Sequence, residues 1–129
     1  MKKSSNSRLK ANPQPVMATI TRNAAGYGVT PIPSLSRGKH DSVLWVNSTG
    51  KDVIVCMSED CNATDRAFLS TRFYVPNAAP NEVPTGPVRS SAHTINTGHE
   101  FSISAGPADE CPCGPKRRIR VAPRIIIVP

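Results

Sequence analysis

Four cysteines are the residues whose chemistry can be read most directly from the chain. Cys56 and Cys61 are separated by four residues, and Cys111 and Cys113 flank a single proline. Three interpretations stay open: two disulfides, a four-thiolate site for Zn²⁺ or Cu(I), or free thiols. The even count and the loop positions favour disulfides. The metal alternative would use Cys56, Cys61, Cys111 and Cys113, and no other cofactor is expected.

Three histidines are the next candidates. His40 precedes Asp41, and His99 precedes Glu100. Neighbouring side chains on a strand point to opposite faces, so neither pair is expected to work as a dyad. We expect structural or solvated roles for both histidines and for His93. The sequence also lacks a glycine-rich phosphate loop, a nucleophile elbow and an H-E-x-x-H helix, so we expect no enzyme activity.

The charge distribution bears on possible partners. Lysine and arginine total 16 against 9 acidic residues, a net charge of +7, and the basic residues gather near the two ends of the chain. Such a chain is attracted to anionic surfaces. Single-strand nucleic-acid binders place stacking aromatics among their basic residues. Residues 116–120 contain none, which argues against nucleic acid.

The first residues bear on location and domain layout. Met1–Lys10 is basic like the start of a secretory signal, but it has no apolar core. No apolar run approaches the ~18 residues of a membrane span. We therefore expect a cytoplasmic protein by default, with a flexible basic tail over residues 1–14 and one domain over residues 15–129.

The stretch from Asp41 to Met57 organises the rest of the expected fold. Ser42–Val46 and Val53–Met57 are rich in β-branched and aromatic residues, and Asn47–Gly50 between them is typical of a turn. We predict a β-hairpin. Both faces of its strands are apolar, so its outer face is either covered, for example by the N-terminal arm, or used for interaction.

The remaining chain reads as further short strands. We predict them over Val16–Thr21, Tyr27–Thr30, Thr71–Val75, Val88–Ile95, His99–Ala105 and a last strand that Pro123 divides into Arg118–Ala122 and Arg124–Val128. The proline-rich residues 76–87 are expected to be irregular. The pattern predicts an all-β domain, a single Greek-key β-sandwich of about seven or eight strands.

Two segments resemble the cupredoxin-like β-sandwich family. They are Asp41–Val55, with its Trp-Val-Asn sequence, and Thr97–Ile103, where a glycine precedes alternating aromatic and polar residues. The resemblance implies a periplasmic or extracellular protein with a copper site. The implied ligands are missing, since Lys51–Val53 contains no histidine, Ser104 and Ala105 offer no thiolate, and no His or Met follows Gly106.

These observations give one leading hypothesis and two alternatives. The leading hypothesis is a non-enzymatic binding or structural module of cupredoxin-like fold, without a type 1 copper site, whose partner is another protein or a second copy. The alternatives are a metal-binding protein using the four cysteines, and a basic nucleic-acid-binding protein.

Overall fold

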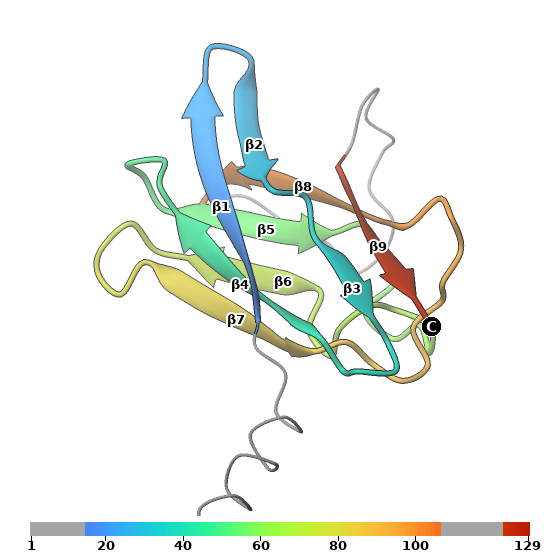
Figure 1. Ribbon diagram of the computed structural model, residues 1–129. Coiled ribbons are helices and arrows are strands. Elements are labelled where there is room, and N and C mark those ends of the chain that lie inside the picture. The colour runs from blue at the N-terminus through green and yellow to red at the C-terminus, as the bar shows by residue number, and fades with distance from the viewer. Residues whose placement is uncertain (1–14, 107–122) are drawn as a thin grey trace, which may run out of the picture.

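The chain folds into two β-sheets, and no helix occurs in the part that the structure describes (Figure 1). The structure is a computed structural model that describes residues 15–106 and 123–129. Its strands are β1 (Val16–Asn23), β2 (Gly26–Thr30), β3 (Ser34–Ser36), β4 (Ser42–Asn47), β5 (Val53–Met57), β6 (Arg72–Val75), β7 (Glu82–Pro87), β8 (His99–Ala105) and β9 (Arg124–Val128). Across these two ranges, no helix is long and apolar enough to cross a membrane.

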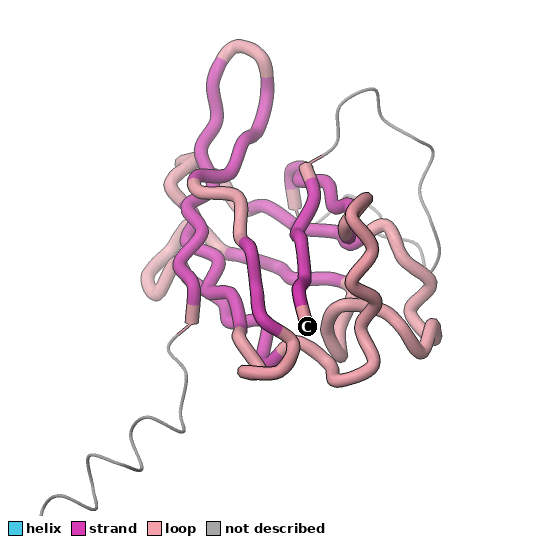
Figure 2. Tube along the Cα trace, turned by 45° about the vertical axis from the view of Figure 1, so that its right-hand side comes forward, coloured by secondary structure: helices cyan, strands magenta, loops and turns pink. Residues whose placement is uncertain are grey.

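The two sheets have the strand orders β2-β1-β4-β7 and β3-β9-β8-β5-β6. Most neighbours are antiparallel, but β1 runs parallel to β4 and β3 runs parallel to β9. Figure 2 shows the strands gathered into a β-sandwich, with the β1–β2 turn extending beyond it. The all-β class and the sandwich character predicted from the sequence are confirmed.

The core lies between the sheets and centres on Trp45 of β4, which is fully buried. Its ring centroid lies 5.4 Å from that of Phe101 on β8 and 6.4 Å from that of Phe73 on β6. The tilted arrangement is the usual geometry of packed aromatic rings. Since Trp45 and its two partners belong to different sheets, these contacts hold the two layers together.

The predicted hairpin over residues 42–57 is wrong. Both strands form, but β4 lies in the four-stranded sheet and β5 in the five-stranded sheet, so residues 48–52 cross between the layers. The buried Asn47 stabilises this crossing. Its Nδ2 donates to the carbonyl oxygens of Lys51, at 2.7 Å, and of Val75 on β6, at 2.9 Å. The side chain therefore ties the end of β4 to the opposite sheet.

Three other sequence predictions need correction. Val88–Ile95 is not a strand, because the N–H groups of Arg89 and His93 donate to the loop after β5 and no ladder with a neighbouring strand forms. The proline-rich stretch predicted to be irregular contains β7, an edge strand, where a missing N–H donor can be tolerated. The short strand β3 was not predicted, and the described residues form nine strands instead of seven or eight.

The remaining predicted strands are confirmed to within a residue or two: Val16–Thr21, Tyr27–Thr30, Thr71–Val75, His99–Ala105 and Arg124–Val128. The predicted tail over residues 1–14 and the predicted strand Arg118–Ala122 lie outside the described residues.

Candidate functional site

A polar cluster lies where β8 begins, and Gly98 sets its position. Gly98 has φ +72°, a conformation that residues with a Cβ rarely adopt. A Cβ at this position would also lie 2.8 Å from Cδ1 of Ile126 and 3.0 Å from the carbonyl oxygen of Ile125. Glycine is therefore required at this turn, and the turn directs the next side chain, His99, into the protein.

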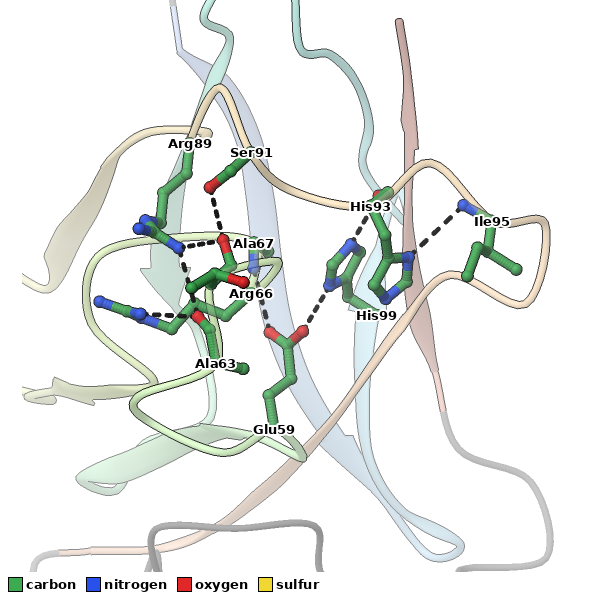
Figure 3. A network of polar contacts seen from close by, with 10 residues as sticks. Glu59, Ala63, Arg66, Ala67, Arg89, Ser91, His93, Ile95 and His99 are labelled. Atoms are coloured by element: carbon green, nitrogen blue, oxygen red, sulfur yellow. Dashed lines mark hydrogen bonds and ion pairs between the residues drawn. The ribbon is translucent and has the colours of Figure 1, made fainter.

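Two loops meet around this histidine, one after β5 and one after β7 (Figure 3). The backbone N–H of Arg89 donates to the carbonyl oxygen of Ala67 at 2.9 Å, and that of His93 donates to Asp65 at 3.1 Å. The Arg89 guanidinium adds a 2.7 Å hydrogen bond to the carbonyl oxygen of Thr64. These bonds fix the two loops to each other, and with them the side chains that they carry toward β8.

His99 forms an ion pair with Glu59, and the pair is almost fully enclosed. Nδ1 of His99 lies 2.6 Å from Oε1 of Glu59, and the two side chains are 0% and 11% exposed. Nε2 of His99 lies 3.0 Å from the carbonyl oxygen of His93. A carboxylate and a carbonyl both accept hydrogen bonds, so both ring nitrogens must donate. The geometry thus fits an imidazolium bound to a carboxylate.

The pKa of His99 follows from two opposed effects. Burial acts against the charged form and lowers the pKa. The hydrogen bonds to Glu59 and to the His93 carbonyl, together with the charges of Glu59 and Asp65, raise it by more. The net result is a pKa above the usual 6.5. Glu59 is itself held in place, since its Oε2 accepts a 3.2 Å hydrogen bond from the Ala67 N–H.

His93 completes the cluster by stacking on His99. The ring centroids are 3.8 Å apart and the planes differ by 13°. The His93 ring accepts one long hydrogen bond, 3.4 Å from the Ile95 N–H to Nδ1. One ligand atom from each of Glu59, His93 and His99 lies within 4.8 Å of the other two. Imidazole nitrogen and carboxylate oxygen are common ligands of divalent transition metals.

A pocket of about 300 Å³ opens onto this cluster. It is lined by Ser58, Glu59, His93, Thr97, Gly98, His99, Glu100 and Arg124. A guanidinium nitrogen of Arg124 donates to Oε2 of Glu100 at 3.0 Å, on the neighbouring strand. His99 and Glu100 therefore have different partners, and they form no dyad, as the strand alternation predicted.

Of the four cysteines predicted as candidate metal ligands, two lie within the described residues. Cys56, at the end of β5, and Cys61, in the loop that carries Glu59, are both disulfide-bonded. A sulfur in a disulfide offers no thiolate to a metal ion. Cys111 and Cys113 lie outside the described residues, so the four-cysteine metal site stays a prediction for a reduced chain.

The positions at which the sequence resemblance implied copper ligands lie side by side at the other end of β5 and β8. Val53 is paired with Ala105, and Ile54 with Ser104. None of these side chains offers the histidine nitrogen or thiolate sulfur of such a site. The remaining histidine, His40, is exposed in a turn with φ 56°.

Sequence reasoning missed Glu59 altogether. It sits in a polar loop 40 positions before His99, and neither its neighbours nor its spacing marks it as a partner. Comparison with protein-family models, curated proteins and solved structures finds no match for the chain.

Proposed function

We propose that this chain is a non-enzymatic binding module with a Greek-key, cupredoxin-like fold that has no type 1 copper site. The fold part is supported by the last two described strands, β8, which is preceded by Gly98, and the apolar β9. The lack of copper is supported by Val53, Ser104 and Ala105 at the positions where ligands would be needed.

The observation that carries the binding role is an apolar row on the outer face of the four-stranded sheet. Met17 of β1 is paired with Leu44 of β4, and Leu44 is paired with Pro84 of β7. Paired residues share a face, and in β4 the other face carries the buried Val43 and Trp45. Met17 is 57% exposed.

A row of neighbouring apolar side chains on one sheet face is typical of a surface that contacts another protein. We take the partner to be a second copy of the chain or another protein with an apolar face. The disulfide-bonded Cys56 and Cys61 favour an oxidising compartment as the place where the chain meets its partner.

The test combines light scattering with native mass spectrometry of the full chain. We expect a dimer or a stable complex, and we expect Met17→Lys to weaken it at least ~10-fold, because a lysine would be buried without a partner. Leu69→Lys is the control, since Leu69 is an exposed apolar residue in the loop that joins β5 to β6 of the five-stranded sheet. A monomer without any partner, or equal effects of the two substitutions, would overturn the proposal.

A further inference from the structure

We infer that Glu59, His93 and His99 form a binding site for a divalent transition metal ion, for which Zn²⁺ is the probe. The site is separate from the outer sheet face and uses none of the four cysteines. Three protein ligands with an open fourth position are the arrangement of many accessible zinc sites, and two histidines with one glutamate are a common ligand set.

The first argument is distance. Ligand atoms of all three residues lie within 4.8 Å of one another. Four ligands arranged tetrahedrally at ~2.0–2.2 Å from zinc are roughly 3.3–3.6 Å apart. The longest of these separations therefore has to shorten by only about 1 Å, which rotation of the His93 side chain can supply.

The second argument is the set of outer contacts. A metal-bound histidine usually donates its other N–H to a carbonyl or carboxylate. His99 already does so, since Nε2 bonds to the His93 carbonyl and leaves Nδ1 to face Glu59. The second oxygen of Glu59 is fixed by the Ala67 N–H. These contacts would orient both ligands before an ion arrives.

The third argument is access and mobility. The pocket reaches all three residues, so an ion can enter without unfolding of the strands. Two stacked rings cannot both point a nitrogen at one ion, so the His93 ring has to rotate off His99. Its long hydrogen bond from the Ile95 N–H offers little resistance to that rotation.

Metal binding would replace a proton. In the metal-free pair the Nδ1 proton of His99 lies between the ring and Glu59, where the ion has to bind. The ion displaces this proton into solvent, and zinc then bonds to Nδ1 and to the carboxylate. The affinity for zinc should accordingly fall about tenfold for each unit by which the pH is lowered, over the range in which His99 is protonated.

The experiment is a zinc titration of the oxidised full chain, by calorimetry and by metal analysis after dialysis. The wild type should bind one equivalent. His93→Phe keeps a ring that can stack but has no nitrogen, and it should weaken binding at least ~100-fold. His40→Asn removes the exposed histidine with a residue that tolerates positive φ, and it should bind as the wild type does.

Three results would overturn the inference: no binding by the wild type, equal binding by His93→Phe, or loss of binding in His40→Asn. If His93→Phe does not fold, the imidazole NMR signals of the wild type decide instead. Zinc should then shift the signals of His93 and His99 and leave that of His40 unchanged. A shift of His40 alone, or no shift, would exclude the site.

Discussion

The paired strands β5 and β8 carry different chemistry at their two ends. At one end, beside Val53 and Ala105, the carboxylate of Asp52 accepts hydrogen bonds from the Tyr74 hydroxyl, at 2.9 Å, and from the Asn77 N–H, at 2.8 Å. This end faces solvent. At the other end, the carboxylate of Glu59 is enclosed with His99.

The difference shows how burial decides the role of a carboxylate. Hydrogen bonds from Asn77 and Tyr74 lower the pKa of Asp52, but water competes for all of these groups, so little stability depends on them. Glu59 is shielded from water and faces the His99 imidazolium, so its loss leaves an enclosed charge without its counter-ion. The same functional group is therefore dispensable at one end and required at the other.

The largest expected effect is the loss of Glu59. Glu59→Leu should lower the free energy of unfolding by about 3–5 kcal/mol, because it leaves the buried His99 without its counter-ion. Chemical denaturation of the metal-free protein measures this. Glu100→Leu is the matched control, since its ion pair with Arg124 is partly exposed, and it should cost at most about 1 kcal/mol. Similar losses in the two variants would remove the proposed contrast between enclosed and exposed carboxylates.

A smaller effect is expected from pH, acting on the same enclosed end. The pKa of His99 is raised in the folded state, so its contribution to stability is complete below the unfolded value of 6.5. The contribution is lost as the pH rises through the folded pKa. The groups that face the ring are Glu59, His93 and Asp65. With chelator present, the urea midpoint of the wild type should decrease as the pH is raised from about 6 to about 9. The midpoint of Glu59→Leu should stay nearly level over the same interval. A midpoint that rises over this interval would contradict the assignment of an imidazolium.

The smallest effect is expected at the exposed end. Tyr74→Phe removes one of the two hydrogen bonds that lower the pKa of Asp52, so this pKa should move up toward 3.8. Because the folded pKa is lowered, the contribution of Asp52 is present above 3.8 and is lost as the pH falls through the folded value. An NMR titration of the Asp52 carboxyl carbon measures the shift. Neutral-pH stability should hardly change, and a large loss there would mean that this end is less exposed than the structure shows.

The strands were predictable because each has a local signature. β1, β5 and β9 are rich in β-branched residues, β8 alternates apolar and polar residues, and turn formers or prolines lie at or just after the ends of these strands. The choice of partners was not predictable from the same signal. A hairpin and a crossing between sheets leave the same apolar pattern in Ser42–Val46 and Val53–Met57, and the hydrogen bond of Asn47 to the opposite sheet cannot be read from its neighbours.

The candidate site was less predictable than the fold. His99 and His93 could be named as candidates from their residue type, but their stacking depends on a loop that the sequence presented as a strand. Glu59 became a partner only because the loops after β5 and β7 bind each other through backbone groups, such as the Arg89 N–H and the Ala67 carbonyl. Backbone hydrogen bonds of this kind leave no trace in residue identity.

The position of β9 between β3 and β8 has a consequence for how the chain assembles during synthesis. The four-stranded sheet needs only residues up to Pro87, whereas among the described strands β3 pairs only with β9. The side chain of Ser36, which ends β3, bonds to the carbonyl of Pro129, 93 positions later. A nascent chain on the ribosome would therefore carry a half-built second layer, with a slot the width of one strand between β3 and β8. Until β9 arrives, that slot is open to a strand from a neighbouring chain, and strand exchange is the misassembly to look for.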